Sequence, residues 1–194
     1  MATMNEEILC RELKFNSGEV DEKKCVEFVL DTFKKSKKKE IVVVNIGTDR
    51  CTGDSYGPFL GSYMEENNCK ISFYGTLEKP IHAKNLEKEL RDIGITHTDA
   101  FIISVDAAVS VRKDVNKISL KNKPIKPGLG VGKDLISLGD MSITFISCES
   151  SLYSSINLGH VRLGMIYKAV KETFKIIREL ENSFAEEYNL REIC

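Results

Sequence analysis

The sequence predicts a single α/β domain built around a mostly parallel sheet. Strand and helix patterns alternate along the chain, which is typical of βαβ crossovers. The strongest strand patterns are continuous apolar runs, as expected for strands that are buried on both faces. With 194 residues and 42% hydrophobic content, the chain can build one large core without metals or crosslinks. We therefore expect one domain over residues 1–194.

The first part of the chain contains the opening strand and helix patterns. Residues 21–38 place apolar side chains at helical spacing between an acidic start and a lysine-rich end, which predicts a helix. The run IVVVNI at 41–46 is rich in β-branched residues and predicts a central strand. A loop of Gly, Thr, Asp and Ser follows, and FLGSYMEEN at 59–67 resumes a helical pattern.

The rest of the chain continues this alternation. Strands are predicted at 71–76, 100–107, 115–127 and 141–147, and helices at 83–94 and 158–184. The segment 115–127 alternates apolar and polar residues, and Pro124 and Pro127 limit its pairing, so we expect an exposed or edge strand there. The stripe of apolar residues along 158–184 predicts a long helix that covers one face of the sheet.

Charge and cysteine usage limit the classes of partner. The 28 basic residues are balanced by 29 acidic ones, so the chain has no general attraction to nucleic acid or to anionic membranes. The lysine cluster at 34–39 is expected to be a solvated helix end, with a functional basic patch as the alternative. No apolar run approaches the ~20 residues that span a bilayer. Singly scattered cysteines and the absence of a secretory signal indicate a reducing cytoplasm.

Three loops follow predicted strands or lie near them, and ligands bind at the carboxyl ends of parallel strands. The first, GTDRCTGDSYGP, supplies Asp49 and Asp54, and the second, DAAVSVR, supplies Asp106. The third, KPGLGVGK, contains the glycines that let the backbone approach a ligand closely, namely Gly128, Gly130 and Gly132. Together the loops predict one pocket at this edge of the sheet.

Asp54 and Asp106 are the strongest candidates for chemistry. Asp54 begins a helix, where an N-cap role is the alternative. Asp106 directly follows a hydrophobic strand, where an ionised group is costly unless a partner or a function compensates, and a turn role is the alternative. Two neighbouring carboxylates can share a proton and leave an acid beside a base. Such a pair can activate water for amide hydrolysis.

Other candidate residues are weaker indications of function. The glycine loop is not a P-loop, because Lys133 is followed by Asp134. His82 lies near a helix start and could orient a substrate, although a surface or capping role is the alternative, and His97 and His160 look structural or exposed. Cys51 could act as a nucleophile only with a histidine beside it.

The ordered motifs resemble a known family. IGTDRCTGDSYGP, YGTLEKPIHAKNL, VDAA and PIKPGLGVGKDL closely resemble the YyaC family of sporulation proteins from spore-forming bacteria, over roughly residues 40–170. More distantly, the same order is similar to the germination protease that degrades small acid-soluble spore proteins, and to the HybD-type hydrogenase-maturation endopeptidases. These resemblances imply a three-layer α/β/α, phosphorylase/hydrolase-like fold of the HybD type.

The resemblance also implies roles for particular residues. In the germination protease, one catalytic aspartate lies shortly before Gly-Pro after a strand and matches Asp54, and the second precedes alanine at a strand end and matches Asp106. The hydrogenase-maturation enzymes use acidic residues at these positions to contact metal and add a histidine further along. This chain has no histidine between Asp106 and His160. Because two carboxylates alone are a poor nickel site, we expect no metal and no other cofactor.

Two functions follow as hypotheses. The first is a sporulation or germination peptidase, in which Asp54 and Asp106 activate water. In this hypothesis the substrate is a peptide or protein, with small acid-soluble spore proteins as candidates, and it is bound by Thr52, His82, Gly128, Gly130 and Gly132. The second is a noncatalytic sporulation factor that binds a peptide or protein in the same cleft. Both place the chain in the bacterial cytoplasm, the forespore included, without nucleic-acid or membrane partners, and leave a homo-oligomer open.

Overall fold

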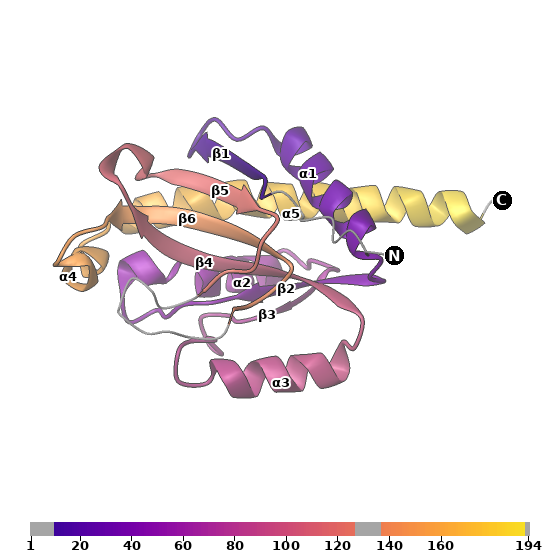
Figure 1. The fold of residues 1–194 in the computed structure, drawn as a ribbon, viewed down its shortest axis with the longest axis horizontal. Helices are drawn as coiled ribbons and strands as arrows, with labels where there is room; N and C mark the ends of the chain where they lie inside the picture. Colours follow the sequence, from indigo (N-terminus) through magenta and orange to yellow (C-terminus); the bar gives the residue numbers. More distant parts are fainter. Residues whose placement is uncertain (1–9, 127–136, 193–194) are drawn as a thin grey trace, which may run out of the picture.

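A mixed sheet forms the centre of the molecule. The computed structural model describes residues 10–126 and 137–192, and within them the sheet has six strands in the order β1-β5-β6-β4-β2-β3 (Figure 1). The strands are β1 (Glu12–Asn16), β2 (Glu40–Asn45), β3 (Ser72–Tyr74), β4 (Ala100–Ser110), β5 (Lys117–Lys121) and β6 (Met141–Glu149). Neighbours among β3, β2, β4 and β6 pair in parallel, whereas β5 pairs antiparallel with both β6 and β1.

Helices lie on both faces of the sheet. They are α1 (Glu22–Ser36), α2 (Tyr56–Glu66), α3 (Leu86–Thr96), α4 (Ser154–Gly159) and α5 (Leu163–Glu192), with short 3-10 turns η1 (Thr52–Asp54) and η2 (Arg112–Asp114). The larger apolar cluster joins α1, α2 and α5 to one face, and a smaller cluster joins α3 to the other. Figure 1 shows α3 on one side of the sheet and α1 and α5 on the other. The predicted α/β class is therefore confirmed.

The apolar run in β2 is explained by these two clusters. Val43 packs into the larger cluster, and its neighbours Val42 and Val44 pack into the smaller one. All three are fully buried. Because successive side chains of a strand point to opposite faces, a strand with helices on both sides is apolar at every position.

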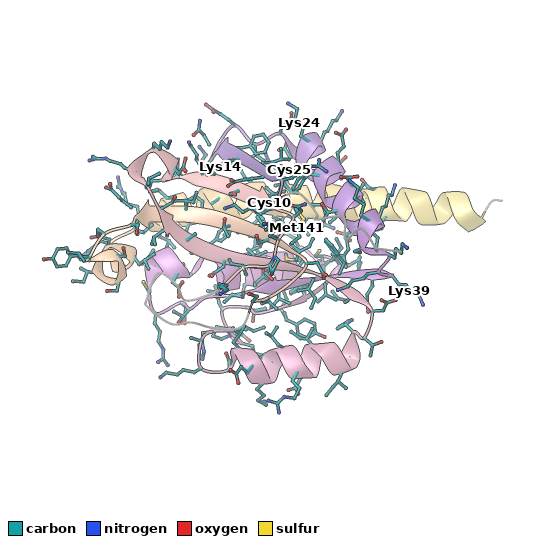
Figure 2. All side chains as sticks on the ribbon, in the orientation of Figure 1. Cys10, Lys14, Lys24, Cys25, Lys39 and Met141 are labelled. Atoms are coloured by element: carbon teal, nitrogen blue, oxygen red, sulfur yellow. The ribbon has the colours of Figure 1, made fainter. Side chains whose placement is uncertain are left out.

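The side chains follow the same division between interior and surface. Figure 2 shows Lys24 and Lys39 at the periphery of the molecule and Cys25 and Met141 inside it. Lys39 belongs to the lysine cluster at 34–39, and its side chain is 86% exposed. No helix in the described part of the chain is long and apolar enough to cross a membrane.

The antiparallel half of the sheet differs from the sequence-based expectation. The segment 115–127 was expected to form an exposed or edge strand, but β5 lies between β1 and β6, and Ile118 and Leu120 are fully buried. Pro124 follows the end of β5 at Lys121 and does not interrupt its pairing, and Pro127 lies outside the described residues. The actual edge strand on this side is β1, which sequence analysis missed.

The long C-terminal helix also begins later than expected. It starts at Leu163, and a separate short helix, α4, precedes it. β4 is longer than predicted, because it continues to Ser110 rather than ending next to Asp106. This extra length determines the surroundings of the candidate site.

Candidate functional site

Asp106 lies inside β4, at the point where the neighbouring strand β2 stops. The last residue of β2, Asn45, pairs with Val105, so Asp106 is the first β4 residue beyond that strand. On its other side, Asp106 pairs with Thr144 of β6. Its side chain is buried, and the Ala107 backbone N–H donates a hydrogen bond to Asp106 Oδ1 at 2.8 Å.

The surroundings of Asp106 favour its protonated form. Burial raises the pKa of Asp106 well above the usual range, and the negative charge of Asp54 raises it further. The hydrogen bond from Ala107 acts in the opposite direction, because it stabilises the carboxylate, but it is the smallest of these effects. Since the Ala107 N–H occupies Oδ1, Oδ2 is the oxygen left for the proton.

Asp54 is held by a tightly folded loop after β2. Its backbone N–H donates to the Cys51 carbonyl at 2.9 Å, and its carbonyl accepts the Thr48 N–H at 3.0 Å. Gly47 has φ of +139°, and a Cβ at this position would collide with the Asp54 carbonyl oxygen. Glycine at position 47 is therefore required both for the backbone conformation and for the close approach.

The Asp54 side chain does not cap the following helix. The capping position of α2 is Ser55, and no side chain makes the capping hydrogen bond there. Instead, Asp54 is half-buried, and its partial removal from water raises its pKa to about 6. An N-cap role would lower the pKa of an aspartate, because donors stabilise the carboxylate.

Both aspartates line one cavity of about 630 Å³ at the carboxyl end of β2. The cavity is also bordered by the β4 residues after Asp106, by Ser142 and Thr144 of β6, and by the segment that leads into α4. The aspartates are close enough for the charge of Asp54 to act on Asp106. Burial raises the pKa of Asp54 to about 6, whereas burial and the charge of Asp54 raise the pKa of Asp106 well above its usual range, so the two carboxyl groups of the cavity are held in unequal surroundings.

His82 lines the same cavity as the two aspartates. The Gly47 N–H donates to the Ile81 carbonyl at 2.8 Å, and this contact joins the loop of His82 to the loop of Asp54. The His82 backbone N–H donates to Asn85 Oδ1 at 2.8 Å, which fixes the turn into α3. The structure thus brings His82 to the aspartate pair.

The other predicted residues are placed differently. Thr52 is in η1 but does not line the cavity, and its carbonyl accepts hydrogen bonds from the N–H and Oγ of Ser55. Gly128, Gly130 and Gly132 lie outside the described residues. Asp49 is exposed and does not line the cavity.

The remaining histidines and Cys51 have other surroundings. His97 bonds to the Tyr74 hydroxyl at 2.8 Å and to Glu40 at 3.1 Å, which ties the end of α3 to the sheet. His160 is exposed at the end of α4. Burial raises the pKa of Cys51, which disfavours the thiolate that a nucleophile needs. Among the described residues, no three His, Cys, Asp or Glu side chains gather as a metal-binding group.

Sequence analysis missed the polar cavity wall formed by β6 and the segment before α4. Ser142 and Thr144 line the cavity beside Asp106, and Ser150, Ser151 and Ser154 border it further on. Ser142 and Thr144 occupy alternate positions in MSITFIS. Because alternate side chains share one face of a strand, this spacing was the signal for a polar patch.

Comparison with known proteins places the chain in a family. Residues 15–176, which include both aspartates, match the family described as "Protein of unknown function (DUF1256)". The chain is also 39% identical over 136 residues to a Bacillus subtilis (strain 168) protein described as "Uncharacterized protein YyaC". That match covers 70% of this chain and 66% of the relative, so it spans just under two thirds of the relative's length. The YyaC part of the resemblance is confirmed, and the chain belongs to the DUF1256 family.

Proposed function

We propose that the protein is a peptidase in which Asp54 and Asp106 activate water to hydrolyse a peptide bond. The observation that carries this proposal is the pair of carboxyl groups that line one cavity, Asp106 buried and Asp54 half-buried, where the charge of Asp54 acts on Asp106. Unequal surroundings push the two pKa values apart, which assigns one residue as base and the other as acid.

The chemistry follows from these protonation states. Asp54, as the carboxylate, takes a proton from water while the water oxygen attacks the peptide carbonyl carbon. Asp106 gives its proton to the carbonyl oxygen, and a tetrahedral intermediate forms. The carbonyl then re-forms as the C–N bond breaks, the hydroxyl proton returns to Asp106, and Asp54 gives its proton to the leaving amine nitrogen. Both aspartates end in their starting states.

Resemblance supports the finer parts of the proposal. Asp54 and Asp106 match the catalytic aspartates of the germination protease, and helices on both faces of the sheet agree with the HybD-like fold of those relatives. On this basis we place the activity in sporulation or germination, in the bacterial cytoplasm, with small acid-soluble spore proteins as candidate substrates.

The test is direct cleavage. Purified protein is incubated with small acid-soluble spore proteins, and the products are identified by mass spectrometry. We expect defined fragments from the wild type and from Asp49→Asn, because Asp49 is an exposed aspartate of the same loop. We expect no fragments from Asp54→Asn or Asp106→Asn. If intact substrate is bound but never cut, the cleft belongs to a noncatalytic binding protein.

A further inference from the structure

We propose that the cavity binds its polypeptide as an extended strand along the open edge of β4, with a large apolar side chain resting on the exposed apolar residues at the start of α4. The open edge is the side of Ala107–Val109 that faces away from β6, where β2 no longer pairs. The apolar contact is Leu152, Tyr153 and Ile156. This inference deepens the proposed function, on which its peptide substrate rests, but binding can be measured without cleavage.

The open edge exists because β4 is longer than β2. β4 pairs with β6 as far as Ser110, but its pairing with β2 ends at Val105. The last contact on that side is the Ile46 N–H, which donates to the Val105 carbonyl at 2.7 Å. Beyond it, no strand in the described part of the chain pairs with this side of β4. A strand edge of this kind offers unpaired backbone groups to another chain.

The backbone groups that face the open side can be identified. Ala108 and Ser110 face β6, because their carbonyls accept hydrogen bonds from Ser147 Oγ at 3.5 Å and from the Ser150 N–H at 2.7 Å. Since backbone groups alternate along a strand, Ala107 and Val109 face the other way. The Ala107 N–H is held by its neighbour Asp106. The Ala107 carbonyl and both backbone groups of Val109 are therefore positioned to pair with a peptide.

This edge lies beside the proposed catalytic pair. Ala107 and Val109 line the same cavity as Asp54 and Asp106, and both are only partly buried. A peptide that pairs with Ala107 lies next to the carboxyl group that holds the Ala107 N–H. Main-chain pairing of this kind binds extended peptides with little dependence on their sequence.

The segment 152–156, which leads into α4 and forms its first turn, supplies the side-chain contact. Leu152, Tyr153 and Ile156 are 97%, 66% and 57% exposed. These residues do not line the cavity themselves, but they are interspersed in sequence with Ser151 and Ser154, which do. In Figure 1, α4 lies at the end of the molecule where β6 terminates. Large exposed apolar side chains so near in sequence to the cavity wall are available to a bound polypeptide that extends past the cavity, and a large apolar side chain of the peptide is the matching group.

The first test is an N-methyl scan. The probes are short synthetic peptides with a central leucine or phenylalanine between serines and threonines, and Asp54→Asn is used so that they are not cut. An N-methyl group removes one N–H of the peptide. We expect methylation at every second position to weaken binding by about tenfold and the positions between to be tolerated. A scan without this alternation, or no binding by any probe, would overturn the inference.

The second test separates the apolar contact from general effects. We expect the triple substitution of Leu152, Tyr153 and Ile156 by serine to weaken binding of the leucine probe by about tenfold or more. A probe with alanine in place of leucine should bind the triple variant almost as well as it binds the wild type, because it has no large apolar side chain to lose a contact. The matched control is Ile95→Ser, because Ile95 is 71% exposed on α3, which lies elsewhere on the molecule. If the triple variant and the wild type bind the leucine probe equally well and have the same melting temperature, Leu152, Tyr153 and Ile156 do not contact the peptide.

The two proposals can fail independently. Alternating N-methyl sensitivity without cleavage of the same peptides by the wild type would contradict the peptidase and leave the strand-binding edge in place. Cleavage, together with a scan in which N-methylation weakens binding equally at every position, would support the peptidase and contradict pairing of the peptide with the β4 edge.

Discussion

Two aspartates of neighbouring segments have opposite surroundings. Asp114 of η2 accepts hydrogen bonds from Lys117 at 2.9 Å and Lys14 at 3.0 Å, and these contacts lower its pKa to about 2. Asp106 of β4 is buried and shares a cavity with Asp54, and burial and the charge of Asp54 raise its pKa. The first aspartate is stabilised as an ion by its partners, whereas the second is kept near a like charge. Carboxyl groups arranged in the second way cost stability, which is typical of sites that carry chemistry.

The largest expected effect is on turnover. Asp54→Asn and Asp106→Asn should each lower kcat by about 10²-fold or more, because each removes one partner in proton transfer. Asp114→Asn, which changes an aspartate of the other kind, should leave kcat unchanged. Peptide cleavage followed by mass spectrometry gives the rates. Equal losses in all three variants would erase the distinction between the two kinds of aspartate.

The second prediction is a bell-shaped pH dependence. The rate should rise as pH increases through about 6, because Asp54 must lose its proton to act as base. It should fall again at higher pH, where Asp106 loses the proton that it donates. The two apparent pKa values belong to the pair as a unit. A rate that does not change between pH 5 and 7 would contradict the role of Asp54.

The third prediction concerns stability. The pKa of Asp54 is raised from 3.8 to about 6 on folding, so its favourable contribution is present below pH 3.8 and is lost as pH rises through 6. The loss amounts to at most roughly 3 kcal/mol at neutral pH. Asp54→Asn should therefore melt at or above the wild-type temperature at pH 7.5, and this advantage should vanish near pH 4. Thermal unfolding at both pH values measures it.

The smallest expected effect is that of Asp114→Asn on melting. The lowered pKa of Asp114 means that its contribution is present above pH 3.8 and is lost as pH falls through about 2. The variant should melt slightly below wild type at pH 7.5, opposite in sign to Asp54→Asn, and the difference should shrink in strong acid. A rise in melting temperature would show that the pairing with Lys14 and Lys117 does not stabilise the fold.

The parallel half of the fold could be predicted from sequence because its signals are local. The run at 41–46 is apolar at every position, and β2 is covered on both faces. The antiparallel half depends on pairing between distant segments, as in the register of Leu13 with Leu120. The short segment of β1 alternates exposed and half-buried residues, and its partner is remote in sequence, so nothing nearby distinguished it from a loop.

Only part of the candidate site could be predicted from the sequence. Asp54 and Asp106 were found because each follows an apolar run. The polar wall of Ser142 and Thr144 and the position of α4 were not found, because they depend on strand order and on how far β4 extends past β2. Relative strand lengths are a tertiary property, and no short sequence motif encodes them.

The pairing of β1 with β5 has a consequence for how the chain folds. Asn16 of β1 pairs with Lys117 of β5, so the N-terminal strand must wait until most of the sheet has been synthesised before its partner exists. Leu13 and Phe15 pack against the core only once that pairing is made. Contacts between such distant segments slow folding. β1, the first of the six described strands to leave the ribosome, should thus be among the last of them to join the sheet.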